Sequence, residues 1–517
     1  MVMNRKYPVG IQSFEKIREG GYAYVDKTAL VYQLAEGGQY YFLSRPRRFG
    51  KSLLLSTLEA YYRGQRELFK GLAIEKLETE WQQHPVLHLD LNAEKYTTPE
   101  ALDTIIDLNL QQWETIYGLS DLAQTLAGRF KRVIQRASEQ TGQKVVILVD
   151  EYDKPILQAI GNPELQDDYR ATLKAVLGVM KSMDAYIQFG MVTGVTKFSK
   201  VSVFSDLNNL TDITMDERFA EICGITEQEI RRDFDSEVAQ VAEHNQMSKD
   251  ECYDLLRRNY DGYHFEAGTV GIYNPYSLLN TLSRMRFKDY WFETGTPTFV
   301  AEVMSKSPID LEQTLHAQAT ADLLGSLDSI EENPLPLLYQ SGYLTIKGYD
   351  AEFGEYQLGF PNEEVERGFT RFLLPYYTPV KKDQGQMFVT NFVKDVRAGK
   401  TEQFMRRLDT FFAQGDYQLV GDAELYFHNA VSLIFRMMGF YTDVERHTAD
   451  GRMDMLVQTS DYIYIIEFKI DKSAEEALRQ IEEKQYAKPF ELDSRKVYKI
   501  GVNFSSQTRR MDGWIFK

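Results

Sequence analysis

Three side chains near the C-terminal end have the types and spacing needed to hold a divalent metal ion and activate water. Asp454 precedes the run MLVQTSDYIYIIEFKI, and Glu467 and Lys469 close its second apolar segment. Side chains alternate along a strand, so residues 467 and 469 are expected on one face and Phe468 on the other. Two carboxylates can bind Mg²⁺ or Mn²⁺, and a nearby ammonium group can orient the attacking water. The set is therefore a candidate for phosphodiester hydrolysis, although charged residues at strand ends also occur for purely structural reasons.

A second candidate site lies where a strand, a loop and a helix are predicted in succession. The segment YYFLS (40–44) is apolar, RPRRFGKS follows, and LLLSTLEAYY has helical length and good helix formers. Gly50, Lys51 and Ser52 would then stand at a helix N-terminus, where backbone N–H groups bind phosphate. Lys51 would reach the β and γ phosphates of ATP, and Ser52 would hold Mg²⁺. At position 45, where the general motif has glycine, this sequence has arginine.

The apolar run VVILVD (145–150) is the clearest predicted strand, and it ends in two acidic residues. Asp150 can hold Mg²⁺ through water, and Glu151 can orient or deprotonate the attacking water. A further strand is predicted over 185–194, and its Thr193 could contact the γ phosphate. The structural alternatives are that Asp150 and Glu151 cap the next helix and that Thr193 simply ends its strand.

The phosphate loop carries further candidate nucleotide contacts. Arg45, Arg47 and Arg48 place positive charge beside the loop, and Phe49 completes the segment before Gly50. The arginines suit a triphosphate, but they could equally pair with acidic residues elsewhere.

Several motifs together resemble the bacterial AAA-ATPase-like family, whose members are commonly fused to a nuclease-like domain of the PD-(D/E)XK superfamily. The motifs are RPRRFGKSL, DEYDKP, GVTKFS, YDGYHF and YNPYS, and the resemblance extends over essentially the whole chain. RPRRFGKS without the first glycine is the usual form in that family, so Arg45 agrees with it. The resemblance implies ATP binding and hydrolysis.

The resemblance also implies roles for residues around the C-terminal set. Glu424, on a predicted helix before the strands, corresponds to an additional acidic metal ligand of many such nucleases. Gln480 matches a recurring catalytic position on the helix after the strands, and Tyr486 is placed on the same helix. The Pro-Asp pair that names the superfamily appears here as Met453-Asp454, which leaves the acid intact.

The predicted fold is α/β and multidomain, since 517 residues exceed what one core usually organises. Strands alternate with helices over the first 200 or so residues, which predicts a P-loop NTPase-type parallel sheet. A mostly helical lid follows, with a winged-helix-like helix, two-stranded ribbon and helix, and the chain ends in a restriction-endonuclease-like αβββαβ core. The expected boundaries are 1–225 for the P-loop domain, 226–380 for the lid, 381–421 for linker helices and 422–517 for the nuclease-like domain.

Composition limits the classes of partner. The net charge of -17 argues against nonspecific coating of nucleic acid, but from Asp422 onward 14 Lys and Arg stand against 16 Asp and Glu, so a local basic groove remains possible. The two cysteines predict neither a disulfide framework nor a zinc site. No apolar run is long enough to span a bilayer, and a cytoplasmic protein is expected. His88, His264 and His428 are interpreted as structural.

The sequence leaves three hypotheses open. The first is an ATP-dependent nuclease that uses Mg²⁺ or Mn²⁺ and cleaves DNA or RNA, with DNA favoured. The second is a nucleotide-driven switch whose nuclease-like domain binds nucleic acid or a partner without cutting it. The third, an ATP-binding scaffold without either reaction, is disfavoured because Glu151 and Lys469 are both present. Assembly into a homo-oligomer is compatible with each hypothesis, since many such ATPases take an arginine from a neighbour.

Overall fold

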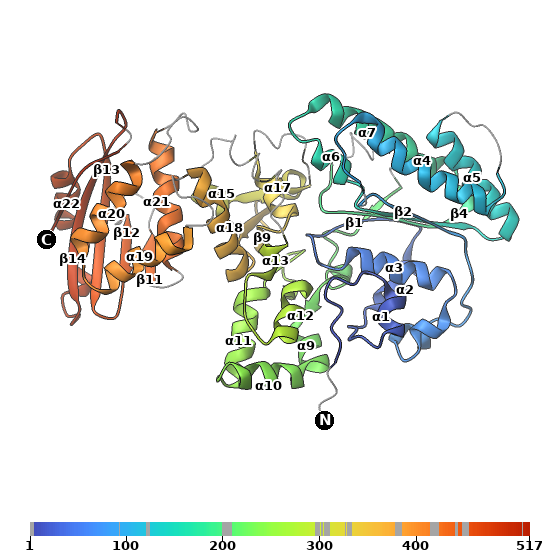
Figure 1. Ribbon diagram of the computed structural model, residues 1–517, viewed down its shortest axis with the longest axis horizontal. Coiled ribbons are helices and arrows are strands. Elements are labelled where there is room, and N and C mark those ends of the chain that lie inside the picture. Colours follow the sequence, from blue (N-terminus) through green and yellow to red (C-terminus); the bar gives the residue numbers. More distant parts are fainter. Residues whose placement is uncertain are drawn as a thin grey trace. The chain divides into compact units, whose positions relative to one another are not determined.

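The computed structural model divides into two units (Figure 1). The first unit comprises residues 1–300 and 317–365, and the second comprises residues 301–316 and 366–517. The four predicted domains are finer than this division, and their boundaries stay predictions. The structure describes residues 5–92, 94–119, 125–198, 209–294, 300, 303, 311–325, 327, 333–377, 385–413, 423–439, 443–446, 454–508 and 510–517.

A five-stranded parallel sheet in the order β2-β3-β4-β1-β5 forms the centre of the first unit. The β1 and β3 strands are buried along their whole length, as their apolar sequences predict. Because β4 lies between β3 and β1, the carboxyl ends of these three strands meet at one edge. The strands are β1 (Tyr40–Ser44), β2 (Val86–Asp90), β3 (Val145–Asp150), β4 (Ile187–Gly194) and β5 (Thr211–Asp212).

Helices cover both faces of this sheet: α1 to α3 lie on one side, and α4, α5 and α7 lie on the other (Figure 1). The α5 helix shows why they pack there, because its buried residues Phe130, Val133, Ile134 and Ala137 recur at helical spacing along one face. The helices are α1 (Phe14–Glu19), α2 (Thr28–Gly37), α3 (Lys51–Tyr62), α4 (Pro99–Ile116), α5 (Leu126–Thr141), α6 (Lys154–Gln158), α7 (Pro163–Leu177) and α8 (Val179–Ser182), with 3-10 turns at Arg66–Phe69, Ala73–Lys76 and Asp184–Tyr186.

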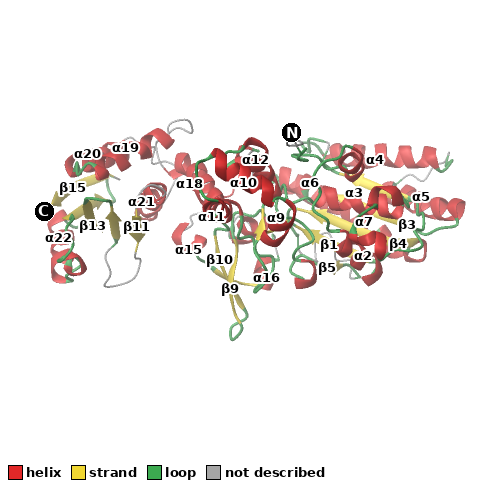
Figure 2. Ribbon diagram, turned by 90° about the horizontal axis from the view of Figure 1, so that it is seen from below, coloured by secondary structure: helices red, strands yellow, loops and turns green. Residues whose placement is uncertain are grey.

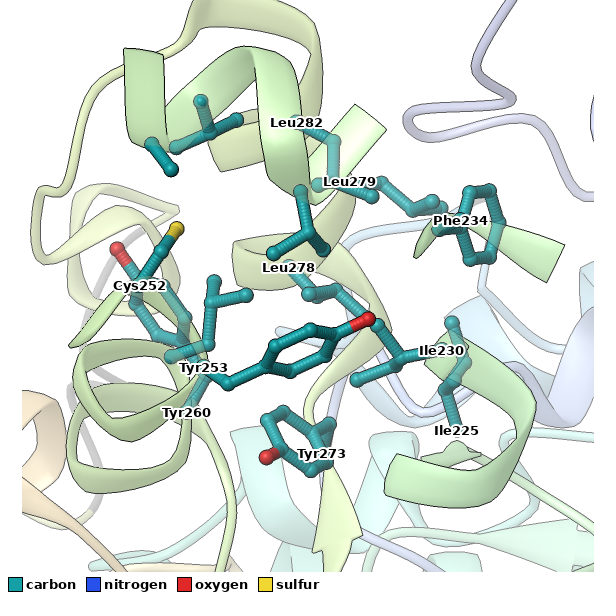
Figure 3. Close-up of a cluster of buried hydrophobic side chains, with 14 of the residues drawn as sticks. Ile225, Ile230, Phe234, Cys252, Tyr253, Tyr260, Tyr273, Leu278, Leu279 and Leu282 are labelled. Atoms are coloured by element: carbon teal, nitrogen blue, oxygen red, sulfur yellow. The ribbon is translucent and has the colours of Figure 1, made fainter. Parts of the chain in front are cut away.

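A helical region follows the sheet and has its own core (Figure 3). Capping boxes begin two of its helices: Thr226 with Glu229, and Ser248 with Glu251, each satisfy backbone N–H groups of the first turn. The elements are a 3-10 turn at Glu217–Phe219, β6 (Ile225–Thr226), α9 (Glu227–Asp233), α10 (Asp235–His244), α11 (Lys249–Tyr260), β7 (Ile272–Tyr273), α12 (Pro275–Arg284) and α13 (Tyr290–Glu293).

The predicted succession of helix, two-stranded ribbon and helix is present, and the β9–β10 ribbon projects from its unit (Figure 2). A third strand, β8, pairs with β10 and was not predicted. The α18 helix begins in the first unit and continues in the second, because the division falls between residues 365 and 366. The elements are α15 (Leu311–Leu315), β8 (Gln318–Thr320), α16 (Ala321–Leu324), α17 (Leu335–Gln340), β9 (Thr345–Asp350), β10 (Glu355–Gly359) and α18 (Glu363–Tyr377).

The second unit contains a five-stranded mixed sheet in the order β11-β12-β13-β14-β15, in which only the β13–β14 pair is parallel. The predicted order of helix, three strands, helix and strand is found as α21, β11, β12, β13, α22 and β14, and β15 is an addition. The elements are α19 (Gly385–Arg397), α20 (Thr401–Ala413), α21 (Ala423–Gly439), β11 (Asp443–Arg446), β12 (Met455–Gln458), β13 (Tyr462–Ile470), α22 (Ala474–Glu483), a 3-10 turn at Lys488–Phe490, β14 (Lys496–Ser505) and β15 (Arg510–Phe516).

The two faces of β13 meet different helices. Ile463 and Ile465 pack in one cluster with Leu478 of α22. Phe468 faces the other way, and its ring lies 6.4 Å from that of Phe435 in α21. The alternation predicted for residues 467 to 469 is therefore present, and Glu467 shares the face covered by α22.

We expect Gly501→Ala to destabilise the second unit. A Cβ at position 501 would lie 2.6 Å from Leu478 N and would also clash with the Ala474 carbonyl oxygen, so α22 would have to move off the sheet. Overpacking of this kind costs about 1–3 kcal/mol of unfolding free energy. Calorimetry of the full chain measures it, with Gly513→Ala as the matched control, because a Cβ there meets nothing within 4 Å. Equal melting of both variants would show that this close approach does not constrain the unit.

Candidate functional site

The loop that follows β1 has an open backbone surface at the start of α3. Gly50 has φ +100°, and a Cβ built there would meet nothing within 4 Å. No side chain caps the N-terminus of α3, so the first N–H groups of this helix are not satisfied by a cap. An open loop followed by an uncapped helix N-terminus is suited to an anion such as phosphate.

Lys51 is only 4% exposed, and its ammonium group is held inside the loop. Its Nζ donates hydrogen bonds to the carbonyl oxygens of Arg45 at 3.0 Å and Pro46 at 3.4 Å. The same atom lies 3.5 Å from Oε1 of Glu151, which follows β3. The loop after β1 and the turn after β3 are thus joined by opposite charges.

The ends of β3 and β4 bring Asp150, Glu151 and Thr193 together. The Thr193 hydroxyl, which is fully buried, donates to Asp150 Oδ1 at 2.7 Å. Glu151 has φ +55°, an unusual conformation for a residue other than glycine. Backbone outliers of this kind are concentrated at functional sites, where the surrounding structure holds them in place.

Asp153, which the sequence pattern did not single out, supports this edge of the sheet. Its buried carboxylate accepts hydrogen bonds from Val195 N at 3.1 Å, from Thr196 N at 2.6 Å and from the Thr196 hydroxyl at 2.6 Å. Burial, and secondly the negative charge of Glu151, raise the pKa of Asp153 to about 7. The residue lies within the DEYDKP motif, but only the fold shows that it fastens the end of β4 to the turn after β3.

A cavity of about 440 Å³ opens over the loop, which is within the usual range for small-molecule sites. The segment 8–12 and the α12 residues Tyr276 and Leu279 form other parts of its wall. Asp150 and Thr193 are buried beside Glu151 and do not line the cavity. The predicted residues that do line it are Arg47, Arg48, Gly50, Lys51, Ser52 and Glu151.

The structure corrects two of the predicted nucleotide contacts. The Arg45 guanidinium is buried, where it donates to Thr214 O at 2.7 Å and Phe219 O at 3.2 Å and lies 3.8 Å from the centre of the Phe265 ring. Phe49 is also buried, with its ring 4.7 Å from that of Tyr263. Both side chains therefore hold the loop in place, and neither lines the cavity.

The C-terminal set converges on Glu467 in the second unit. Lys469 Nζ donates to Glu467 Oε1 at 2.9 Å, and Gln480 Nε2 of α22 donates to the same oxygen. Asp454 lies just before β12, and its Oδ2 accepts from Phe468 N at 2.9 Å. The structure therefore brings Asp454, Glu467 and Lys469, which the strand pattern singled out, to one place with Gln480, which the resemblance implied.

One oxygen atom of Glu467 has no hydrogen-bond partner among the residues that the structure describes. The side chain is 1% exposed, and the atom without a partner in those ranges is the buried Oε2. Burial raises the pKa of Glu467, the hydrogen bond from Lys469 lowers it, and the charge of Asp454 raises it further. A buried carboxylate oxygen without a donor fits a site for a cation.

Other predicted residues are less well placed. Tyr486 was expected on the helix after the strands, but α22 ends at Glu483, and Tyr486 lies beyond it with its hydroxyl 3.5 Å from Gln480 Nε2. Glu424 and His428 belong to α21, but their side chains fall outside the part of the chain that the structure describes.

The ranges that the structure describes were considered for a metal-binding cluster and for a membrane span because either would change the kind of site expected. Within those ranges, no three His, Cys, Asp or Glu side chains come together as a metal-binding group. None of the helices in the same ranges has the length and apolar character to cross a membrane.

Comparisons with known proteins match two regions of the chain, and each region contains one of the two groups of residues described above. A family model described as "Predicted AAA-ATPase" matches residues 8–204, and a "PD-(D/E)XK nuclease superfamily" model matches residues 422–514. A protein of Azotobacter chroococcum mcd 1, described as "Uncharacterized protein in vnfD 5'region", is 35% identical over 526 residues, which cover 99% of this chain and 98% of that protein. The chain belongs to the predicted AAA-ATPase family. Its C-terminal part is a PD-(D/E)XK nuclease superfamily domain, which confirms the resemblance, the α/β multidomain fold and the nuclease-like end of the chain.

These memberships indicate ATPase and nuclease-type functions in one AAA-ATPase family chain. The AAA-ATPase match contains both the loop after β1 and the turn after β3, and the PD-(D/E)XK match contains the Glu467 set. The two groups of side chains described above thus fall in the two matched regions.

We expect Thr193→Val to destabilise the first unit, because it removes the hydroxyl that donates to buried Asp150. An unsatisfied buried acceptor costs about 1–3 kcal/mol of unfolding free energy. The control is Thr115→Val, whose hydroxyl donates at 2.8 Å to the Gln111 carbonyl oxygen within α4. Calorimetry compares the two variants, and an equal or larger loss for Thr115→Val would contradict the importance of the Thr193–Asp150 bond.

Proposed function

We propose that this protein binds and hydrolyses ATP in the cavity of the first unit and cleaves nucleic-acid phosphodiesters at the Glu467 set, with the nucleotide controlling cleavage. The observation that carries the proposal is the unsatisfied Glu467 Oε2, which has a lysine and a glutamine on the other oxygen of the same carboxylate. A carboxylate arranged in this way is suited to share a cation with Asp454 rather than to stabilise the fold.

In the first unit, the residues present fit a nucleoside triphosphate. The open face at Gly50 would receive the phosphates, and Lys51 would exchange its loop carbonyls for phosphate oxygens. Ser52 would hold Mg²⁺ directly, and Asp150, which does not line the cavity, would hold it through water. When bound, the ion neutralises charge on the phosphates. Glu151 would orient or deprotonate the attacking water. Thr193 would act through its hydrogen bond to Asp150.

In the second unit, Asp454 and Glu467 would hold Mg²⁺ or Mn²⁺, which would polarise the phosphodiester and its attacking water. Glu424 remains a proposed further ligand from the resemblance. Lys469 would orient the water and stabilise charge on the phosphate, and Gln480 would position the Glu467 carboxylate through its hydrogen bond. Nucleic acid is the proposed substrate, with DNA the first to be tested and RNA the second.

A specific observation favours the alternative in which the second unit binds nucleic acid or a partner without cutting it. The chain carries a net charge of -17, which opposes tight binding of a polyanion. Among the described residues, moreover, only Asp454 and Glu467 supply carboxylates to the set, and no third acidic ligand joins them.

Lys51→Ala should lower the affinity for ATP about 10- to 100-fold, the equivalent of one lost hydrogen bond to a charged group. Titration with a fluorescent ATP analogue measures the effect. The control is Lys144→Ala, whose side chain is exposed just before β3, at the opposite edge of the sheet. Unchanged binding by Lys51→Ala would remove the loop after β1 from the nucleotide site.

Glu467→Gln should reduce cleavage at least about 100-fold, because the amide keeps the volume but cannot supply a charged metal ligand. Labelled single- and double-stranded DNA and RNA are incubated with Mg²⁺ or Mn²⁺, with and without ATP, and ATP turnover is followed in parallel. Glu483→Gln is the control, since that carboxylate is 68% exposed at the end of α22. Full cleavage by purified Glu467→Gln would refute the site. Absence of cleavage by the wild-type protein, alongside ATP turnover, would favour the binding alternative.

A further inference from the structure

Lys154 places a second ammonium group in the wall of the nucleotide cavity. It is the first residue of α6, three positions after Glu151, and both residues line the cavity. Its Nζ donates to Asn92 Oδ1 at 2.9 Å and to the Asn92 carbonyl oxygen. Asn92 follows β2 and also lines the cavity. The lysine therefore bridges the ends of two neighbouring strands at the edge where the phosphate loop lies.

The register of the sheet fixes this position. The β2 and β3 strands are parallel neighbours, with Asp90 opposite Asp150, so Asn92 and Glu151 emerge at the same edge. Lys154 N also donates to Glu151 O at 3.1 Å in the tight turn between them. The side chain thus extends from the turn that carries the proposed water-orienting carboxylate.

The charges around the Lys154 ammonium group are those of other residues at this end of the sheet. Burial lowers the pKa of Lys154, while the carboxylates of Glu151 and Asp90 raise it and the charge of Arg47 lowers it. Lys51 interacts with Glu151 at 3.5 Å from the phosphate loop. Glu151 is therefore within electrostatic reach of two ammonium groups, one from the loop after β1 and one from α6.

We propose that Lys154 contacts the terminal phosphate of bound ATP and stabilises its charge during hydrolysis, as a cation supplied by the same chain. This inference rests on the proposed ATPase function. In the reaction, the water oxygen bonds to the γ phosphorus, and the bond from that phosphorus to the β–γ bridging oxygen breaks. The electron pair of the broken bond stays on ADP, and a water proton passes to Glu151 and then to solvent. Lys154 would leave Asn92 for the γ-phosphate oxygens, where negative charge has to be stabilised.

The structural alternative is that Lys154 only ties α6 to the end of β2 through Asn92. A residue that acts on the transferring phosphate matters most when that phosphate, or a mimic of it, is present. A residue that only supports the fold affects the binding of all nucleotides alike. Comparing ADP with ADP plus aluminium fluoride, a mimic of the transferring phosphoryl group, separates the two roles.

The test uses the full chain with Lys154→Met, which keeps the length of the side chain but removes its charge. We expect its affinity for ADP to stay within about threefold of wild type, while its affinity for ADP–aluminium fluoride with Mg²⁺ falls at least about tenfold and ATP turnover falls about 100-fold. Lys154→Arg should recover part of both losses. Lys95→Ala is the control, because that lysine is exposed in the loop that follows Asn92.

Three other outcomes would contradict the proposal, and they can be told apart. Equal losses of affinity for ADP and for ADP–aluminium fluoride would assign Lys154 to the structural role. Turnover by Lys154→Met at the wild-type rate would refute the inference and leave the ATPase function intact. A wild-type protein that neither binds nor hydrolyses ATP would refute the ATPase function itself, and the role of Lys154 with it.

Discussion

The parallel pairing of β4 with both β1 and β3 is the constraint on which the nucleotide cavity depends. Parallel strands deliver their carboxyl ends to one edge, so the loop after β1, the turn after β3 and the end of β4 meet although the three strands end at residues 44, 150 and 194. Lys51, Glu151 and Thr193 come from these three segments. The hydrogen bond from Thr193 to Asp150 and those from the 195–196 backbone to Asp153 then hold the strand ends together.

The buried carboxylates of the two sites differ in how many of their oxygen atoms accept hydrogen bonds. The Asp153 carboxylate accepts hydrogen bonds from two backbone N–H groups and a hydroxyl, so it is satisfied by the fold. Glu467 has two donors on one oxygen and, within the described part of the chain, none on the other. A fully hydrogen-bonded carboxylate stabilises a turn, whereas a half-satisfied one retains a desolvation cost that a bound cation would relieve. This difference separates a structural acid from a candidate ligand more sharply than burial alone.

The sequence predicted those features that local pattern determines. Apolar runs marked β1, β3 and β13, and alternation along β13 placed Glu467 and Lys469 on one face. It did not predict Asp153 or Asn92, because their partners lie at the ends of other strands and only the tertiary fold brings them together. Arg45 was misinterpreted for the same reason, since the carbonyl groups that hold its guanidinium come from residues 214 and 219. The short strands β5 and β8 have two and three residues, too few to show a period.

Coupling between the cavity and the second unit requires an element with two arrangements that both sites can influence. The loop after β1 is a candidate for such an element, because in the proposed function Lys51 would leave the loop carbonyl oxygens for a phosphate. Trp291 Nε1 donates to Arg47 O in this loop at 3.1 Å, and Trp291 N donates to buried Glu364 at 2.7 Å. Glu364 belongs to α18, the helix that continues into the second unit. Trp291 thus joins the loop after β1 to the start of α18 through two hydrogen bonds, both within the first unit.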